Sequence, residues 1–299
     1  MPLAGRGRRY TAARHAVEWS LGAAYRGNWP ARLVRALGMQ RRVRVREHRI
    51  ATARWPPGVR PLRLVFASDL HAGPTTHPSL LDEAFAAIAA ANADVLLLGG
   101  DYVFLLARYI SQIEHRLARL ARPPLGIYAV HGNHDLWADD AAITAALERG
   151  GARVLVNDRA VLPPPFDHVA VAGIDDPWTG IAPTGPVFRD NDRVRIVLVH
   201  APEAMTLLGD EPFELAVCGH THGGHVALPG GIPILVPGPL SRRYAHGRYD
   251  VGGRPHADRE PRHRRNRGRA PDQRRSRCAR RRGRRVIREA DLKAIVAAW

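Results

Sequence analysis

Two histidines placed two residues apart follow a short apolar stretch late in the chain. His220 and His222 stand in the glycine-rich run 219–224, directly after the apolar residues 215–218. Neutral imidazole is the commonest protein ligand for transition metals, and flanking glycines let the backbone fold closely around an ion. A histidine in a turn is more often a hydrogen-bonded surface residue, so this pair alone supports a metal site only weakly.

Four further clusters of ligand-type residues precede this pair, and each follows an apolar run typical of a buried strand. They are Asp69 with His71, Asp101 after two glycines, Asn133-His134-Asp135 after His131-Gly132, and His200. Sites in open α/β sheets lie at the carboxyl ends of the strands. We expect Asp69 and His71 to alternate on a strand end and so to face the same side. Five clusters of one design make a chance arrangement improbable.

The chemistry of these side chains indicates which ions they would hold. Nitrogen and oxygen ligands without a thiolate favour manganese, iron or zinc over calcium. Seven ligands are too many for one ion, but they suit two ions that share a carboxylate. Two ions about 3.5–4 Å apart can activate a water and stabilise an in-line displacement at phosphorus. The residues therefore predict a hydrolase that cleaves phosphoesters with two divalent metal ions.

In this order the clusters resemble the motifs of the calcineurin-like metallophosphoesterase family. The resemblance covers about residues 60–250 and is closest to the bacterial YkuE/YaeI-type phosphodiesterase branch, which is similar to UDP-2,3-diacylglucosamine hydrolases of lipid A biosynthesis. The motifs are Asp69-x-His71, Gly100-Asp101, Gly132-Asn133-His134-Asp135, His200 and Gly219-His220-x-His222. The branch usually has Gln after Gly-Gly, where this chain has His225, which is either an extra polar contact near the ions or a surface residue, and we favour the second interpretation.

The resemblance implies a role for each residue. One ion would be held by Asp69, His71, Asp101 and His222, and Asp101 would bridge to a second ion held by Asn133, His200 and His220. His134 would be catalytic without binding metal, stabilising the phosphate or protonating the leaving oxygen, and Asp135 would orient it. A hydroxide bridging the ions would be the nucleophile. The substrate would be a phosphodiester or pyrophosphate, either a small molecule or a lipid-linked nucleotide sugar such as UDP-2,3-diacylglucosamine.

The distribution of charge, the cysteine count and the N-terminal sequence bear on nucleic-acid binding, disulfide content and localisation. The chain has 299 residues and a net charge of +17, but residues 254–299 hold 17 of the 45 basic residues and 5 of the 28 acidic ones. The strong basicity therefore belongs to this tail. Two cysteines exclude a disulfide framework. The N-terminus lacks the continuous apolar segment of a signal peptide, so we expect a cytoplasmic protein that contacts the inner face of a bacterial membrane peripherally.

The chain divides into three parts by composition. Residues 1–58 hold an amphipathic helical segment (10–39, broken at 27–30) and a half-exposed edge strand (42–55), residues 59–253 hold the phosphoesterase domain, and residues 254–299 form the tail. Segment 10–39 is basic and bears tryptophans, so it lies either on an anionic membrane or against the domain's flank. In the domain, apolar patterning predicts buried strands at 62–67, 94–98 and 126–130, short strands at 153–156, 169–174 and 195–199, and helices at 79–92, 105–121 and 139–149. This order predicts a β-sandwich flanked by helices, and the resemblance implies its four-layer form, α/β/β/α.

The tail does not fit this fold. Residues 254–285 are dominated by arginine and have few apolar residues, so we expect them to be disordered. We interpret the tail as the product of a shifted reading frame, because codons that fit residues 257–266 would encode a family-like strand one base later. On this interpretation the C-terminal strands of the fold are missing, and residues 286–298 form at most an isolated helix.

Two alternatives to an active hydrolase remain. One is a basic module that binds membranes or nucleic acid through the tail and the N-terminal helix. Nucleic acid is not expected as the main partner, since an anion-binding module has no use for seven inward-facing ligands. The other is a truncated homologue whose catalysis is impaired.

Overall fold

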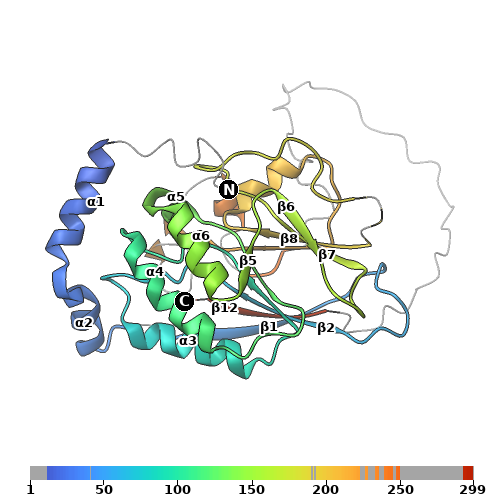
Figure 1. Cartoon of the computed structure of the whole chain (residues 1–299), viewed down its shortest axis with the longest axis horizontal. Coiled ribbons are helices and arrows are strands. Elements are labelled where there is room, and N and C mark those ends of the chain that lie inside the picture. Colours follow the sequence, from blue (N-terminus) through green and yellow to red (C-terminus); the bar gives the residue numbers. More distant parts are fainter. Residues whose placement is uncertain are drawn as a thin grey trace, which may run out of the picture.

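The computed structural model (Figure 1) shows two stacked sheets with helices outside them. It describes residues 12–40, 42–189, 191, 193–222, 226–227, 233–235, 239–244, 247–249 and 292–298. His225 and the arginine-rich segment 254–285, with its predicted disorder and frameshift origin, lie outside these residues. The predicted boundaries at residues 58 and 253 stay predictions.

The first sheet has six strands in the order β1-β12-β2-β3-β4-β5. Its parallel strands are β2 (Leu62–Ala67), β3 (Val95–Leu98), β4 (Ile127–Ala129) and β5 (Ala152–Val154). The edge strand β1 (Arg44–Ile50) alternates between exposed and half-buried residues, as the charge pattern predicts. All of these strands overlap the segments predicted from apolar patterning.

One strand of this sheet corrects a prediction. β12 (Leu292–Ala298) lies between β1 and β2, antiparallel to the first and parallel to the second. The expectation that these residues form an isolated helix is therefore wrong. The expectation that the fold lacks its C-terminal strands is also wrong for this strand. The spacing of apolar residues here is locally helical, but a strand in this position pairs its backbone with two neighbours, and such non-local pairing outweighs local propensity.

The second sheet has four strands in the order β6-β7-β8-β9. β7 (Val169–Gly173), β8 (Val194–Val199) and β9 (Leu215–Cys218) are parallel, and β6 (Asp158–Val161) pairs antiparallel with β7. A small separate ribbon joins β10 (Val226–Ala227) and β11 (Pro233–Leu235). The sequence patterns did not predict β6 or this ribbon.

Alternation along the strands builds the layers. Leu62, Leu64 and Phe66 face the second sheet, where they pack with residues such as Val171 and Ile196 in one core cluster. Val65 and Ala67 of β2 face the helices α3 (Pro78–Ala90), α4 (Ile110–Arg119) and α6 (Asp140–Arg149). The outer face of the second sheet packs on the 3-10 helix η3 (Pro202–Leu208), which hydrogen-bonds to α7 (Pro239–Arg243). The predicted α/β/β/α architecture is confirmed.

The N-terminal helices lie beside this sandwich (Figure 1). α1 (Ala12–Ala24) and α2 (Trp29–Ala36) are separated by the short 3-10 turn η1 (Arg26–Asn28), where Gly27 and Asn28 adopt positive φ. The structure therefore has helices on both sides of the predicted break in this segment. Among the described residues, no helix has both the length and the apolar character needed to cross a bilayer.

Candidate metal centre

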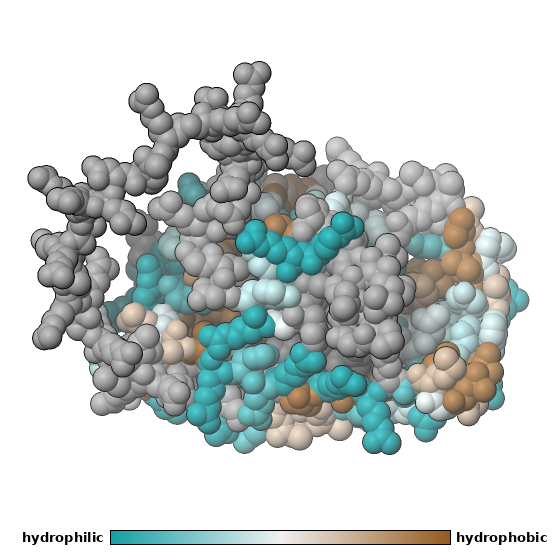
Figure 2. All heavy atoms as spheres, turned by 180° about the vertical axis from the view of Figure 1, so that it is seen from behind, coloured by the Kyte–Doolittle hydropathy of each residue, from teal (hydrophilic) through white to brown (hydrophobic). Residues whose placement is uncertain are grey.

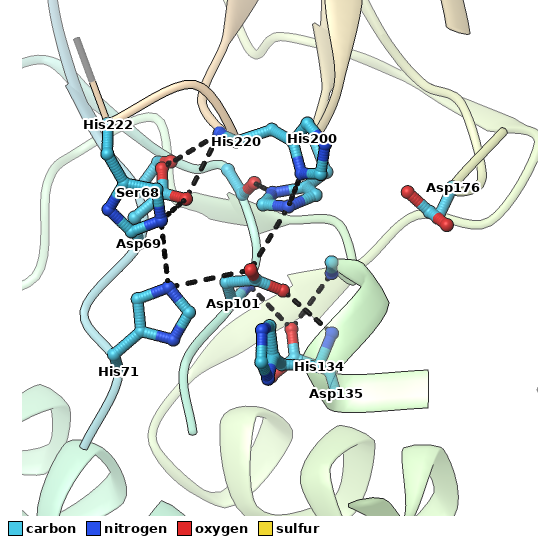
Figure 3. A network of polar contacts seen from close by, with 12 residues as sticks. Ser68, Asp69, His71, Asp101, His134, Asp135, Asp176, His200, His220 and His222 are labelled. Atoms are coloured by element: carbon cyan, nitrogen blue, oxygen red, sulfur yellow. Dashed lines mark hydrogen bonds and ion pairs between the residues drawn. The ribbon is translucent and has the colours of Figure 1, made fainter. Parts of the chain in front are cut away.

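The predicted ligands meet at one edge of the sandwich, where strands of both sheets end (Figure 3). Asp69 and His71 follow β2, Asp101 follows β3, His200 follows β8, and His220 and His222 follow β9. Asn133, His134 and Asp135 begin a short helix, α5 (Asn133–Ala138), which the sequence patterns read only as a turn. Because the parallel strands of both sheets finish at this edge, residues up to 153 positions apart come together there.

Three overlapping triads of these side chains have ligand atoms within 4.8 Å of one another. The triads are Asp69-His71-His222, His71-Asp101-His134 and Asp101-His200-His220. The first and third fit the two ion sites that the resemblance implies. The second also draws in His134, which the resemblance leaves outside the ligand set.

Asp101 lies between the two sides of this centre. Its Oδ2 is 3.6 Å from Nε2 of His71 and 3.3 Å from Nε2 of His200. On the first side, Nε2 of His222 is 3.1 Å from Nε2 of His71 and 3.4 Å from Oδ1 of Asp69. On the second side, Nδ1 of His220 is 3.2 Å from Nε2 of His200.

The backbone that presents these ligands is unusual. Five of the nine described non-glycine residues with positive φ are predicted ligands, namely Asp69, His71, Asp101, His220 and His222. The expected strand alternation of Asp69 and His71 is wrong, because β2 ends at Ala67 and both residues adopt left-handed conformations. Each such residue costs about 1–3 kcal/mol and persists where surrounding contacts hold it, which is typical of functional sites.

Backbone hydrogen bonds hold these loops in register. The N–H groups of Asp69 and His71 donate to the carbonyls of Gly100 (3.0 Å) and Asp101 (2.9 Å). The N–H of His220 donates to both oxygens of Asp69, at 3.0 and 3.1 Å, and so ties the second sheet to the first. A Cβ on Gly219 would collide with the side chains of Ser68 and Asp69, so only glycine allows this approach.

Asp135 fixes the loop that carries Asp101. It is fully buried, and its carboxylate accepts the N–H groups of Asp101 (2.8 Å), Tyr102 (2.9 Å) and Gly132 (2.9 Å). The N–H of His134 in turn donates to Oδ1 of Asp101 at 2.9 Å. Asp135 therefore holds the Asp101 loop against the start of α5, which carries His134, while its predicted role in orienting His134 stays a prediction.

Burial and mutual charge perturb the ionisable groups strongly. Burial acts to raise the pKa of Asp101, but the positive charges of His200 and His134 hold it well below its usual range. Burial opposes the protonation of His200, yet Asp101 raises its pKa to about 10. Burial lowers the pKa of His71 to about 4, and burial with the charge of His200 lowers that of His220 to about 3. Burial and the charge of Asp101 raise the pKa of Asp135 to about 8.

These residues fit divalent metal ions. Oδ1 of Asn133 is buried and, among the described residues, has no hydrogen-bond partner. Leaving a buried polar atom unpaired costs about 1–3 kcal/mol. Coordination of a metal ion by this oxygen would remove that cost. Imidazole, carboxylate and amide groups without a thiolate form the donor set expected for manganese, iron or zinc.

One carboxylate beside the centre was not predicted. Asp176 follows β7, which pairs in register with the strand leading to His200. Its Oδ2 accepts the N–H and the hydroxyl of Thr179 and the N–H of Trp178, at 2.7–3.1 Å, whereas its buried Oδ1 has no partner among the described residues. The signal was present, because Asp175-Asp176 follows an apolar strand just as Asp69 and Asp101 do.

Comparison with known proteins identifies the family. The model of the calcineurin-like phosphoesterases matches residues 62–224, from the start of β2 to just beyond His222. The chain belongs to this family. It is therefore a metal-dependent phosphoester hydrolase, as the motifs predict, with candidate ligand clusters in the expected place.

Relatives from bacteria and animals share the same region. Phosphodiesterase YaeI of Escherichia coli is 33% identical over 202 residues, which cover 65% of this chain and 72% of YaeI. The metallophosphoesterase YkuE of Bacillus subtilis is 30% identical over 211 residues, 69% of this chain and 73% of YkuE. A transmembrane protein with a metallophosphoesterase domain from Danio rerio is 28% identical over 225 residues, 68% of this chain and 48% of that protein. The predicted resemblance to the YkuE and YaeI branch is thereby confirmed.

Proposed function

We propose that this hydrolase cleaves a phosphodiester or pyrophosphate bond with two divalent ions, manganese, iron or zinc, that share Asp101. The position of Asp101 carries the proposal. Its carboxylate lies within 3.6 Å of imidazole nitrogens that belong to two different ligand groups. A carboxylate so placed can serve both ions, as a dinuclear site requires.

Each group in the centre has a distinct task in this proposal. Asp69, His71 and His222 would hold one ion with Asp101, while Asn133, His200 and His220 would hold the other. Bound ions supply charge neutralisation for the phosphoryl group and activation of water at neutral pH. The protein fixes their ligands through the loop hydrogen bonds described above.

His134 acts on the substrate rather than through a metal. Its ring lies between aromatic neighbours, with centroids 5.1 Å from Trp137 and 5.5 Å from Phe104. These contacts hold the ring beside the first ion group, 5.0 Å from that of His71. As the bond between phosphorus and the leaving oxygen breaks, protonated His134 gives its proton to that oxygen. This transfer is general acid catalysis.

The substrate we propose is a phosphodiester or pyrophosphate carried by a lipid-linked nucleotide sugar, for example UDP-2,3-diacylglucosamine. Two observations support it. A relative at 33% identity is named a phosphodiesterase, and large apolar side chains are exposed on the N-terminal helices α1 and α2. The enzyme would then work peripherally at the inner face of a bacterial membrane, in contact with it through residues 10–39.

A hydrolysis assay tests this function. The full chain is stripped with a chelator, reloaded separately with manganese, iron(II) or zinc, and given UDP-2,3-diacylglucosamine, a nucleotide sugar without acyl chains, or a simple chromogenic phosphodiester. We expect metal-dependent turnover, fastest on the lipid-linked substrate. Equal rates on all three would refute the lipid-linked substrate alone. Metal binding without turnover on any of them would indicate the impaired homologue instead.

A further inference from the structure

Large apolar side chains are exposed on the N-terminal helices. Leu37 is 62% exposed and Met39 67% exposed, and the same segment leaves further large side chains in solvent: Val17, Trp19, Trp29, Leu33 and Val34. Figure 2 shows apolar side chains at the end of the molecule where Figure 1 places α1 and α2. Few large apolar groups are exposed in the other described parts of the chain. Such a concentration of exposed apolar side chains is typical of a surface that binds a partner or a membrane.

The charges around this surface are almost all positive. Residues 26–49 contain eight arginines and one acidic residue, Glu47. Leu33 lies on α2 and Leu37 directly follows it, one turn further on the same side, while Arg32 lies about 100° around the helix from Leu33 and Arg35 lies on the opposite face. An apolar stripe on one side with arginines on the remaining face is typical of helices that lie in the interface of an anionic bilayer.

A polar cavity opens directly beside the apolar stripe. It has a volume of about 440 Å³ and is lined by Arg35, Gly38, Gln40, Arg42, Ser79 and Glu83. Gly38 and Gln40 are the chain neighbours of the exposed Leu37 and Met39, so the cavity borders the segment that carries these apolar side chains. The cavity is therefore placed where lipid headgroups would lie if the stripe entered a bilayer.

The lining of this cavity favours an anion. The guanidinium of Arg35 donates to the hydroxyl of Ser79, and the amide of Gln40 donates to the same oxygen at 3.4 Å. Ser79 lies in the first turn of α3, and this first turn contains no acidic residue. The carboxylate of Glu83 is engaged by the N–H of Val43 at 3.1 Å. Two arginines thus face the cavity with one carboxylate that is already hydrogen-bonded.

We propose that this surface docks on an anionic phospholipid bilayer. Leu33, Leu37 and Met39 enter the boundary between headgroups and acyl chains, and Arg35 and Arg42 hold the phosphate of one phospholipid headgroup in the cavity. The inference rests on the peripheral membrane contact proposed above and names its lipid chemistry and its residues. A second copy of the chain is a poor occupant, because two surfaces this basic repel each other. Nucleic acid would leave the apolar stripe uncovered.

The docking surface is connected to the candidate metal centre. Glu18 and Trp19 of α1 line a small cleft together with Leu106, Trp137 and Ala138. Trp137 belongs to α5, the helix that carries His134, and packs against the His134 ring. Docking through α1 and α2 would therefore bring the centre close to the bilayer. A substrate with acyl chains could then reach it without leaving the membrane.

Vesicle sedimentation tests the proposal. The full chain is mixed with vesicles of phosphatidylcholine alone or with about one third phosphatidylglycerol, a composition that supplies the surface charge such segments need. We compare the wild type with the pair Arg35→Gln and Arg42→Gln, and with the pair Leu37→Asn and Met39→Asn. The matched control is Arg119→Gln with Arg122→Gln, which removes the same charge from exposed positions near the edge where the strands begin. Thermal melting checks that each variant is folded.

We expect the wild type to bind the anionic vesicles far better than the neutral ones. Each cavity arginine removed should weaken binding about fivefold, the apolar pair should weaken it at least about tenfold, and the control pair should change it about twofold at most. Equal losses of binding in the cavity pair and the control pair would show that the overall positive charge, and not the cavity, accounts for binding, and would overturn the proposal. So would binding that survives both test pairs, or a cavity that takes inorganic phosphate while vesicles do not bind. Because vesicle binding needs no turnover, a failure of the proposed hydrolysis leaves this result readable.

Discussion

Replacing Asp101 with asparagine tests the two-ion centre most directly. Asp101→Asn keeps the size of the side chain and can keep the hydrogen bond from the N–H of His134 to Oδ1. What it removes is the negative charge between Nε2 of His71 and Nε2 of His200. The substitution therefore separates the charge of this residue from its place in the fold.

The expected loss follows from the distances. A unit charge 3.3 Å from the carboxylate, the distance to Nε2 of His200, interacts with it by about 5 kcal/mol at an effective dielectric constant of about 20. A divalent ion at the same distance would gain about twice as much, and the cost of desolvating a buried carboxylate cancels several kcal/mol of that gain. A net loss of about 5 kcal/mol remains, which weakens metal binding by more than about a thousandfold.

Metal content and calorimetric titration with manganese or zinc measure this loss. We expect about two ions per wild-type chain and, because both groups share Asp101, loss of both from Asp101→Asn together with turnover. Asp69→Asn should lose only the ion of the Asp69-His71-His222 group. Asp82→Asn, which removes an exposed carboxylate paired with Arg116, serves as the charge-matched control. An Asp101→Asn protein that still binds two ions would refute the shared carboxylate.

Three further predictions concern other residues. His134→Ala should keep the full metal content but lower kcat by about a hundredfold to ten-thousandfold, and metal loss would show that His134 is a ligand. Gly219→Ala should lower metal affinity because its Cβ collides with Ser68 and Asp69, as titration calorimetry would show, and unchanged affinity would mean that the loop has room to move. Burial raises the pKa of Asp94, but hydrogen bonds from Arg60 and the backbone outweigh burial and lower it. Ionised Asp94 therefore stabilises the fold above its unfolded pKa of about 3.9, and this contribution is lost as the pH falls through the lower folded pKa. In urea unfolding, Asp94→Asn should cost about 1–2 kcal/mol at pH 6, with the gap to wild type closing in acid, whereas a gap independent of pH would contradict the reasoning.

Much of the fold follows from patterns within single segments. Leu62, Leu64 and Phe66 face one core while Val65 and Ala67 face another, and such a strand, buried on both faces, reads as an apolar run. The ligand-type residues after each run then locate the edge of the sheets where the centre forms. The helix α5 was missed because Asn133-His134-Asp135 has the composition of a turn, whereas the carboxylate of Asp135 supports its first turn from within.

The rest depends on contacts that local patterns do not contain. β12 is a strand because β1 and β2 pair with it from residues more than 200 positions away. Asp176 was missed although Asp175-Asp176 follows an apolar run, because only the pairing of β7 with β8 places it near the strand that leads to His200. In each case the sequence contains the residues, and the pairing of distant strands decides what they do.

The metal centre shows the same division at the level of single residues. Ligand types and order are legible in the sequence, but the direction in which each ligand points is set by a left-handed backbone at Asp69, His71, Asp101, His220 and His222. This conformation is unfavourable for residues other than glycine. It is held by bonds between loops, such as the N–H of His71 to the carbonyl of Asp101 and the N–H of His220 to the carboxylate of Asp69. The second of these bonds joins the two sheets, so the complete centre forms only in the assembled sandwich, and a contact between the sheets offsets part of the strain at its ligands.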